Sequence, residues 1–384
     1  MGGWQHVTIG DACQLVNGGT PKTKIVEYWD GPYAWITPAE MGRRESPYVS
    51  NTRRTLSKDG LIKCSASLLP YRSVILSSRA PIGHLVINEV PMATNQGCKG
   101  LIPNDELHYK FLYYYLASIV TLLNDLGAGT TFKELSATRL RTVPIPIPPL
   151  PEQELIVTIL DEAFAAIATA TANAEKNIAN ARELFESELK RTFTTRQKGW
   201  HELHFEDVCT LQRGFDLPKR LRKKGEYPIL SSSGAIDAHC EVRVSGPGVV
   251  VGRSGSVGSV FFVEENFWPL NTVLYVKNFH GNQPEFVFWF LKQFGLQRFA
   301  GGAGVPTLNR NHVHGILVTV PADPVEQVRI VKRVNELRTR ADGIVKLYKA
   351  KLAALTNLKQ SILQKAFSGE LTAKTDKIIA EAGV

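Results

Sequence analysis

Four short segments contain residue types that act in catalysis, but each departs from the pattern its chemistry requires. Asp30-Gly31-Pro32-Tyr33 approaches the Asn/Asp-Pro-Pro-aromatic signature of amine methyltransferases, but glycine replaces the first proline and no glycine-rich cofactor loop precedes it. Gly255-Ser256-Val257-Gly258 lacks the Gly-Lys-Ser/Thr that would complete a phosphate-binding loop. Glu188-Leu189-Lys190 imitates the end of a nuclease site but lies within a helical charge pattern, and His312-Val313-His314 has no carboxylate or cysteine beside it to complete a metal site. The sequence therefore predicts no catalytic residue, no metal site and a protein that is not an enzyme.

The cysteines and the chain start favour an intracellular protein. Five cysteines are spread along the chain, and none forms a C-x-x-C pair, which argues against a disulfide framework or a zinc site of that kind. The first residues lack a charged region followed by an apolar core, so no signal peptide is expected. No apolar run approaches the roughly 20 residues that cross a bilayer. We expect a soluble, cytoplasmic protein without membrane contact.

Length and charge suggest two domains and a polyanionic partner. A chain of 384 residues exceeds one compact core, and its 43% hydrophobic and 21% charged residues are typical of globular proteins. The formal net charge of +9 suits a nucleic acid. Charge alone does not separate DNA from RNA or a membrane surface, and a merely basic soluble protein remains the alternative.

An internal repeat determines the predicted architecture. Trp4 is followed seven residues later by Asp11-Ala12-Cys13, and Trp200 is followed at the same spacing by Asp207-Val208-Cys209. Further corresponding segments occur in the same order: 74–83 and 249–258, Asn95-Gln96 and Asn271-Thr272, 111–116 and 286–291, and 127–131 and 302–306. We also expect Arg79 and Arg253 to occupy equivalent points after the same strand. The chain is therefore expected to contain two similar domains.

Each half ends in a proline-rich strand followed by a long helical pattern. The strands lead into Glu152-Gln153 and Glu326-Gln327, and proline both ends a strand and suits the first turn of a helix. From Glu152 to Phe193 and from Glu326 to Phe367, 41 positions in each case, apolar residues recur at spacings of three and four, with Leu358 in the second stripe. These patterns predict two equal helices of about 60 Å that form a coiled coil.

The two helices carry opposite charge balances, which favours their pairing. Residues 151–199 contain eight acidic and six basic residues, whereas residues 324–384 contain six acidic and twelve basic residues. Exposed ion pairs contribute little each, and the alternative is that each helix packs on its own globular domain.

These patterns define the predicted fold class: α/β, with two mixed α/β domains separated by two long antiparallel α-helices in a pseudo-two-fold internal repeat. The expected boundaries are 1–150 for the first globular domain, 151–197 for the first helical spacer, 198–323 for the second globular domain, and 324–384 for the second helical spacer with the C-terminal tail. Strands are expected at 34–37, 73–76, 84–87, 248–251 and 272–276, and amphipathic helices near 110–120 and 285–295.

Over essentially its full length the chain resembles the specificity (S) subunit of Type I restriction-modification enzymes. The resemblance is carried by Trp4 with Asp11-x-Cys13, the matching set from Trp200, the two strands that end in Glu-Gln, and the segment from Leu363 to Leu371. One departure is Thr194-Thr195-Arg196-Gln197, which replaces the Ser-Gly-Glu-Leu found after the second helix.

The resemblance implies a non-catalytic DNA-binding subunit. It implies two methyltransferase (M) subunits docked along the helices, which use S-adenosylmethionine to make N6-methyladenine. It also implies restriction (R) subunits that use ATP and Mg²⁺, so that no cofactor is bound by this chain. The protein would act in a prokaryotic cytoplasm and associate with the nucleoid when bound to double-stranded DNA. Because the two domains differ, the target would be bipartite and asymmetric.

Candidate DNA-binding residues fall into two groups. Contacts with phosphates are expected from basic clusters, for which a solvated charge run is the alternative: Lys22, Lys24, Arg43, Arg44, Arg53 and Arg54 in the first half, and Lys219, Arg220, Arg222, Lys223 and Lys224 in the second. Base contacts are expected from Arg79 and Arg253, although residues shared by both halves are as readily structural. Further candidates follow the glycine-rich turns: Thr130, Thr131, Lys133, Thr307, Asn309 and Arg310.

The main alternative is a duplicated nucleic-acid-binding scaffold outside restriction-modification, such as an RNA-binding protein. The sequence lacks the aromatic motifs expected of common RNA-binding modules. A stand-alone methyltransferase or nuclease is disfavoured by the missing motifs.

Overall fold

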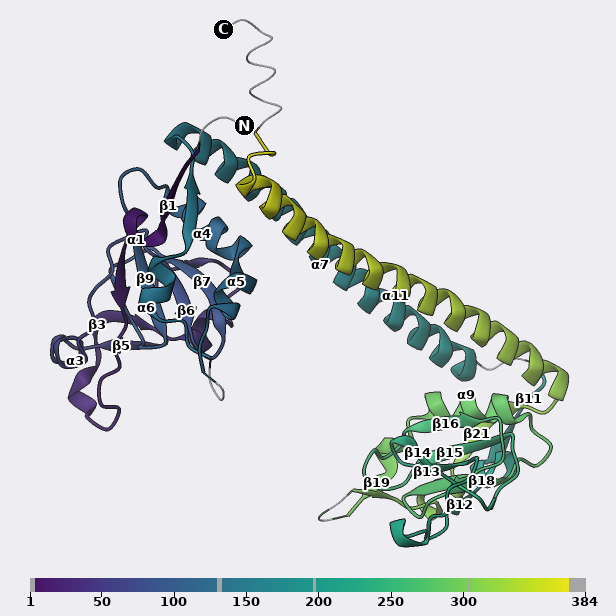
Figure 1. Cartoon of the computed structure of the whole chain (residues 1–384). Coiled ribbons are helices and arrows are strands. Elements are labelled where there is room, and N and C mark those ends of the chain that lie inside the picture. Colours follow the sequence, from purple (N-terminus) through teal and green to yellow (C-terminus); the bar gives the residue numbers. More distant parts are fainter. Residues whose placement is uncertain (1–3, 130–132, 196–197, 303, 305, 373–384) are drawn as a thin grey trace, which may run out of the picture. The chain divides into compact units, whose positions relative to one another are not determined.

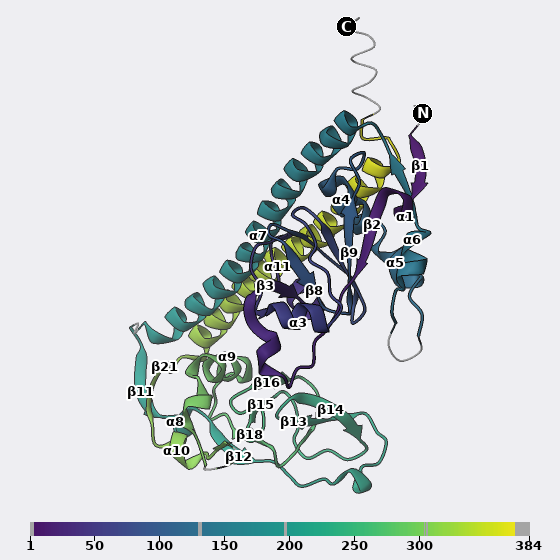
Figure 2. The same cartoon turned by 90° about the vertical axis from the view of Figure 1, so that its left-hand side faces the viewer.

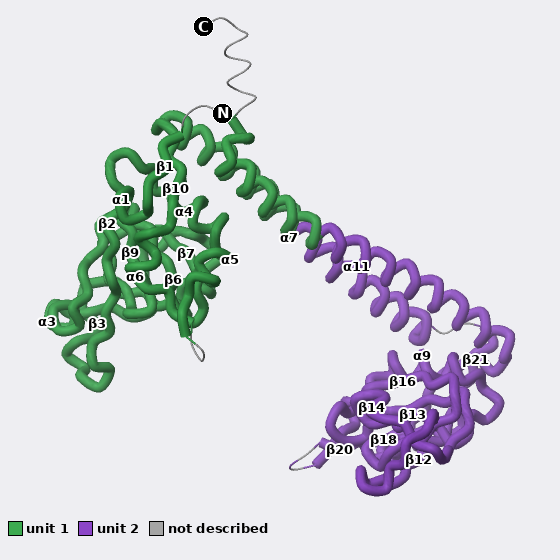
Figure 3. The backbone as a smooth tube through the Cα atoms, in the orientation of Figure 1, with its two compact units in different colours: residues 1–172, 352–384 green, residues 173–351 purple. Residues whose placement is uncertain are grey.

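The computed structural model describes residues 4–129, 133–195, 198–302, 304 and 306–372. The chain divides into two compact units (Figure 3). Unit 1 comprises Met1–Ala172 and Leu352–Val384, and unit 2 comprises Asn173–Lys351. Each unit thus contains one globular part and segments of two long helices.

Unit 1 is built on a mixed sheet in the order β2-β9-β6-β7-β4. Its strands are β2 (Cys13–Asn17), β9 (Cys98–Pro103), β6 (Val74–Ser78), β7 (Ile82–Asn88) and β4 (Tyr48–Val49). A second sheet has the order β5-β3-β8, with β5 (Arg54–Leu56), β3 (Trp29–Ile36) and β8 (Met92–Thr94), and β1 (Gln5–Thr8) pairs with β10 (Pro144–Ile147). The helices are α1 (Ile9–Ala12), η1 (Val26–Tyr28), α2 (Pro38–Met41), α3 (Lys58–Lys63), α4 (Tyr109–Ser118), α5 (Val120–Asp125), α6 (Ala137–Arg141) and the start of α7 (Leu150–Thr194).

Unit 2 repeats this plan with a four-stranded sheet in the order β12-β18-β15-β16. Its strands are β12 (Thr210–Arg213), β18 (Val273–Asn278), β15 (Gly248–Gly252) and β16 (Val260–Val263). The smaller sheets are β14 (Gly234–His239), β13 (Tyr227–Ser231) and β17 (Trp268–Pro269); β11 (Trp200–His204) with β21 (Leu317–Pro321); and β19 (Ala300–Gly301) with β20 (Thr307–Leu308). The helices are α8 (Phe205–Val208), η2 (Lys219–Leu221), α9 (Pro284–Phe294), η3 (Leu296–Phe299), α10 (Asn311–His314) and the start of α11 (Pro324–Phe367).

The predicted repeat, strands and helices are confirmed. Each of the five expected strand segments overlaps a strand, and the two aromatic segments form α4 and α9. Both helices are amphipathic and pack their apolar side on a sheet: Phe111 and Leu112 are buried in the core of unit 1, as Phe286 and Val287 are in the core of unit 2.

The long helices α7 and α11 have 45 and 44 residues, and within each unit their segments lie side by side and antiparallel (Figures 1 and 2). In unit 1 the start of α7, with Ile156 and Leu160, joins one core with Leu363 near the end of α11. In unit 2 Leu189 of α7 and Val334 of α11 join the other core. The helices therefore both pair with each other and pack on the globular parts, so the two alternatives are not exclusive.

The apolar stripe of α11 differs from its predicted course near its end. Leu358 is 47% exposed, whereas Leu363 is 2% exposed. Lys359 lies on the packed side instead, with its ammonium group 4.9 Å from the ring centre of Phe164. The prediction for Leu358 was wrong because a helix has 3.6 residues per turn, so a strict spacing of three drifts out of the contact face.

Among the described residues, α7 alone is long and apolar enough to cross a membrane by length and composition. An 18-residue window of it has a mean hydropathy of 1.7. Because Ile156, Val157 and Leu160 are buried in the core of unit 1, we assign α7 to the fold rather than to a bilayer.

A buried glutamine side chain fixes each long helix to the globular part of its unit. Gln153 is fully buried; its Oε1 accepts from the backbone N–H of His108 (2.8 Å), and its Nε2 donates to the carbonyls of Glu106 and Pro148 (both 2.8 Å). A buried amide is tolerated only when its donors and acceptor are all satisfied, as they are here.

The same clamp recurs in unit 2. Gln327, also fully buried, accepts from the backbone N–H of Gln283 (2.9 Å) and donates to the carbonyl of Pro321 (3.0 Å) and to Oδ1 of Asn282 (2.6 Å). The repeated Glu-Gln pair of the sequence thus has a structural explanation in its second residue.

A second pair of contacts lies about two turns further along each helix. In unit 1 Asp161 accepts from Lys110 Nζ (2.7 Å) and from the hydroxyl of Tyr114 (2.5 Å). Burial opposes the charged form of Lys110, but the hydrogen bonds and charge interactions with Asp161 and Tyr48 together outweigh it and raise the pKa of the ammonium group.

In unit 2 the corresponding residue is Asn335. Its Oδ1 accepts from Trp289 Nε1 (3.1 Å), and its Nδ2 donates to Glu285 (2.7 Å). The same helix position thus carries a charged Asp161 in unit 1 and an uncharged Asn335 in unit 2. This is expected of two domains that share a fold and differ in detail.

We predict that Gln327→Ala lowers the free energy of unfolding by about 2–3 kcal/mol, because it leaves a buried N–H and a buried carbonyl without partners. Chemical unfolding of the full chain measures this. Gln360→Ala is the matched control, since Gln360 is exposed on the same helix. Equal effects of the two substitutions would contradict the clamp.

Candidate nucleic-acid interface

In unit 1, Arg79 and Glu134 come together beyond the end of β6. The two residues form an antiparallel backbone bridge, and the N–H of Leu135 donates to the carbonyl of Ser78 (2.8 Å). Arg79 Nη1 lies 3.6 Å from Glu134 Oε2, and the side chains are 34% and 43% exposed. The predicted base-contact candidate is thus paired with a carboxylate that is not among the residues predicted from the sequence.

Lys99 of β9 lies in the same electrostatic environment. It is 7% exposed, and its strand neighbours are Leu76 and Asn17. Burial lowers the pKa of its ammonium group, the nearby Glu134 opposes this, and Arg79 adds to it. Lys99 is also absent from the predicted residues, although a lysine between the apolar residues of a buried strand is a sequence signal that could have revealed it.

The corresponding region of unit 2 contains a different set of polar groups. Arg253 Nη1 donates to the carbonyl of Asn271 (3.2 Å), and the N–H of Leu308 donates to the carbonyl of Arg253 (2.8 Å). The carboxylate here is Asp216, which accepts from the side chains of Asn271 and Arg213.

The strand register shows that Arg79 and Arg253 are not equivalent positions. Leu76 pairs with Lys99 and Val251 pairs with Leu274, and these two pairs correspond in the two sheets. Two residues further along, Arg253 corresponds to Ser78. The backbone bridges agree, because Arg79 pairs with Glu134 as Ser254 pairs with Thr307. The corresponding segments 74–83 and 249–258 also place Arg79 opposite Ser254, so that alignment holds. Only the predicted equivalence of Arg79 and Arg253 was wrong, and the two arginines are distinct features of the two units.

The remaining candidates near the glycine-rich turns divide as follows. Thr130 and Thr131 lie outside the described residues, while Lys133 and Asn309 are exposed. Thr307 is half-buried in β20. Arg310 Nη1 donates to the carbonyl of Leu211 at 3.4 Å, so part of its bonding capacity is used within the fold.

The basic cluster of unit 1 contains both exposed and engaged side chains. Lys22, Lys24, Arg43 and Arg53 are exposed. Arg44 is instead bound to Glu40 (2.9 Å), and the guanidinium of Arg54 stacks 3.4 Å from the ring centre of Trp29. In Figure 1, α3 and β5 lie at the end of unit 1 far from the start of α7, which places Arg53 and Arg54 at that end.

The basic cluster of unit 2 divides in the same way. Lys219, Arg220, Lys223 and Lys224 are exposed. The side chain of Arg222 is 13% exposed, and Nη1 lies 3.4 Å from Oδ2 of Asp237. Arg222 therefore holds the basic segment to β14.

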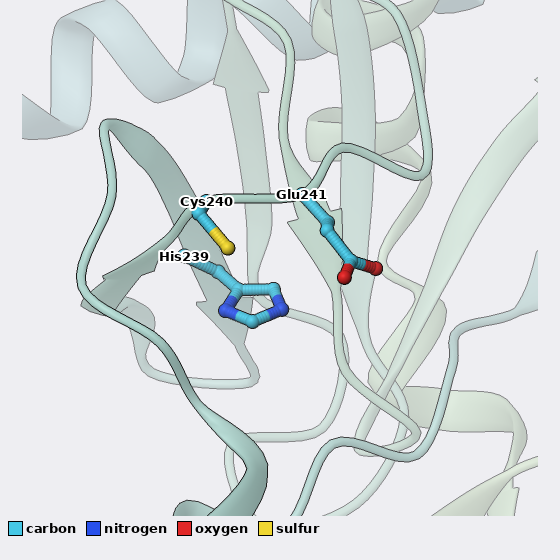
Figure 4. Close-up of side chains that lie close together, drawn as sticks. All are labelled: His239, Cys240 and Glu241. Carbon is cyan, nitrogen blue, oxygen red and sulfur yellow. The ribbon is translucent and has the colours of Figure 1, made fainter.

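His239, Cys240 and Glu241 lie close together at the end of this strand (Figure 4). Their ligand atoms are within 4.8 Å of one another, the arrangement that a metal ion requires at minimum. However, His239 Nδ1 is engaged by the backbone N–H (3.0 Å) and carbonyl (3.1 Å) of Lys223, and its ring meets Trp268 edge-on. We assign His239 to anchoring the basic segment.

Two of the segments that resemble catalytic motifs have structural roles. Asp30, with a φ of 59°, lies in an irregularity of β3 where the register shifts between Trp29 and Tyr33. His314 Nε2 accepts from the N–H of Leu211 (3.0 Å), and burial lowers the pKa of its imidazole.

Comparison with known families decides between the main interpretation and the scaffold alternative. Residues 1–178 and 197–356 each match the family described as Type I restriction modification DNA specificity domain. The chain belongs to this family. The two matches coincide with the two halves of the repeat, and they favour a Type I specificity subunit over a scaffold outside restriction-modification.

Individual members of the family are moderately similar. The MjaIX specificity subunit of Methanocaldococcus jannaschii is 32% identical over 56% of this chain, and the match spans only about half (54%) of that subunit. The EcoKI specificity subunit of Escherichia coli strain K12 is 24% identical over 97% of this chain and 90% of its own length.

Solved structures show the same fold. The HsdS subunit of Thermoanaerobacter tengcongensis matches with a TM-score of 0.63 at 16% identity, covering 96% of this chain and 98% of that one. A chain from a structure concerning complex assembly and conformational transition of the type I R-M system matches with a TM-score of 0.81 at 16% identity, covering 96% and 99%.

We predict that Arg222→Ala lowers the free energy of unfolding by about 1–2 kcal/mol, because it removes a mostly buried guanidinium and the partner of Asp237. Thermal unfolding checks this. Arg220→Ala, two residues away and exposed, is expected to leave the melting temperature unchanged. A larger effect at Arg220 than at Arg222 would refute this division of the cluster.

Proposed function

We propose that this chain is the DNA sequence-specificity subunit of a Type I restriction-modification complex. In this proposal each unit binds one half of a bipartite, asymmetric site in double-stranded DNA. The chain itself is non-catalytic; methyltransferase subunits supply S-adenosylmethionine chemistry, and restriction subunits use ATP and Mg²⁺. The complex acts in the cytoplasm of a prokaryote.

The observation that carries the proposal is a duplicated DNA specificity domain. Its two copies share a fold but differ in the polar residues near the ends of β6 and β15. Unit 1 places Arg79, Lys99 and Glu134 where unit 2 places Ser254, Leu274 and Thr307. Sequence information resides in contacts with base edges, so different side chains at equivalent points support two different half-sites.

Exposed cations near these ends support contacts with phosphates. The clusters that remain exposed are Lys22, Lys24, Arg43 and Arg53 in unit 1, and Lys219, Arg220, Lys223 and Lys224 in unit 2. Phosphate contacts of this kind position a protein on DNA without specifying sequence.

The solvent-facing sides of the long helices support docking of methyltransferase subunits. On α11 in unit 2, Val325, Val328, Ile344 and Leu347 are 57%, 53%, 42% and 66% exposed. Leu184 of α7 is 63% exposed. Exposed large apolar side chains that recur along one helix support a protein-binding surface there.

We predict that exchanging residues 1–150 for those of a relative changes one half-site and leaves the other unchanged. The complete complex is expressed with its methyltransferase, and methylome sequencing gives the modified motif before and after the exchange. A change in both half-sites would contradict independent recognition by the two units, and a wild-type complex that leaves no bipartite motif would refute the proposed function.

We also propose that α7 and α11, each of which contributes to both units, set the length of the unread spacer between the half-sites. Inserting one or two helical turns near residue 175 is expected to change the spacer length while both half-sites stay the same. The same methylome assay measures this. A spacer of unchanged length in an active complex would overturn the role of the helices as a ruler.

A further inference from the structure

The Arg79–Glu134 pair of unit 1 is arranged as a recognition element. The backbone bridge fixes both residues next to each other, and the side chains remain 34% and 43% exposed. A guanidinium has five N–H donors, so one contact with Glu134 leaves most of them for a ligand. The pair therefore presents donors and an acceptor side by side at the surface.

The course of the Arg79 side chain is restricted by its surroundings. It passes over Gly97, where a Cβ would lie 3.1 Å from Arg79 Cγ and 3.2 Å from Nε. Gly97 N–H is held in turn by Oδ1 of Asn95 (2.9 Å), whose amide donates to Thr20 (2.8 Å). Because this turn is held by hydrogen bonds, it restricts the conformation of the Arg79 side chain that packs on it.

The carboxylate distinguishes between two kinds of DNA contact. An exposed Glu134 repels a phosphate, so a simple backbone contact would be stronger without it. A base pair is different, because its major-groove edge offers acceptors and donors together. In a G·C pair, guanine presents O6 and N7 to arginine, and the cytosine amine donates to a carboxylate.

We propose that Arg79 and Glu134 together recognise one G·C base pair in the half-site bound by unit 1. Arg79 donates to guanine O6 and N7, and Glu134 orients Arg79 and accepts from the cytosine amine. This inference rests on the proposed function and names the chemistry of that site. Lys99 interacts electrostatically with both residues, and its positive charge balances Glu134.

The pair is specific to unit 1. The bridged positions in unit 2 are Ser254 and Thr307, which carry no charge. The other half-site thus serves as an internal control, because its recognition does not depend on an ion pair at these positions.

The test uses the complete methyltransferase complex and duplexes that carry the wild-type motif, with each base pair varied in turn. The conservative variants are Arg79→Lys and Glu134→Gln. Arg79→Lys keeps the charge but loses the two parallel donors. We expect it to reduce discrimination at one G·C position of one half-site on the order of 10- to 100-fold, the range of one bidentate base contact, measured as the ratio of kcat/KM values. Glu134→Gln is expected to relax the same position.

Lys133→Ala is the matched control, since Lys133 is exposed and adjacent to Glu134. It is expected to weaken binding to all duplexes equally, or to have no effect. Thermal unfolding and discrimination at the second half-site are expected to be unchanged in all three variants.

Three results would overturn the inference. Arg79→Lys with wild-type discrimination would assign Arg79 to a phosphate. Uniform weakening at all positions by Glu134→Gln would make it structural. If the two variants affected different base pairs, Arg79 and Glu134 would not recognise one base pair together. In each case the wild-type complex still yields a bipartite motif, so failure here is distinct from failure of the proposed function.

Discussion

The structure depends on burying a side-chain amide at the start of each long helix. Gln153 and Gln327 are both fully buried, and each makes three hydrogen bonds to the segment that precedes α4 or α9 and to the strand that precedes the helix. An amide in this setting tolerates little displacement, because any loss of a partner leaves a polar group without water. The orientation of each globular part on its helix is thereby fixed. The placement of the polar residues beyond the end of β6 or β15 is fixed with it.

Charged residues have two separate roles in this chain, and their contacts tell them apart. Arg44, Arg54 and Arg222 are engaged by a carboxylate or by an aromatic ring within the fold. Their neighbours Arg43, Arg53 and Lys223 remain exposed. A run of basic residues is therefore not a uniform surface. Some of its side chains bind within the fold and hold the segment in place, and the others remain free for a ligand.

Much of the architecture followed from the sequence because it was encoded in long-range regularities. The repeat of Trp4 at Trp200 and the apolar spacing of the two helices each involve many residues, so single deviations do not hide them. The details of the site were less accessible. Glu134 joins Arg79 through an irregular bridge that no local pattern signals, and Lys99 acquires its environment only when β9 is placed in the sheet.

The same limit explains why the stripe of α11 was misplaced at Leu358. Apolar residues lie at several registers near the helix end, and Leu363 is the one that joins the core to which Phe111 and Phe164 also belong. The sequence shows which apolar residues are available for a core. The elements that pack against the helix determine which of these residues are buried.

The offset of one residue between Arg79 and Arg253 has a consequence for how such domains diverge and how they are engineered. Successive residues of a strand project to opposite faces, so inserting or deleting a single codon turns a new side chain toward the ligand without replacing any residue. Target preference in a duplicated domain can then change by slippage as well as by substitution. Grafts that match Arg79 with Arg253 would install an arginine on the wrong face, and hydrogen-bond register is the safer template.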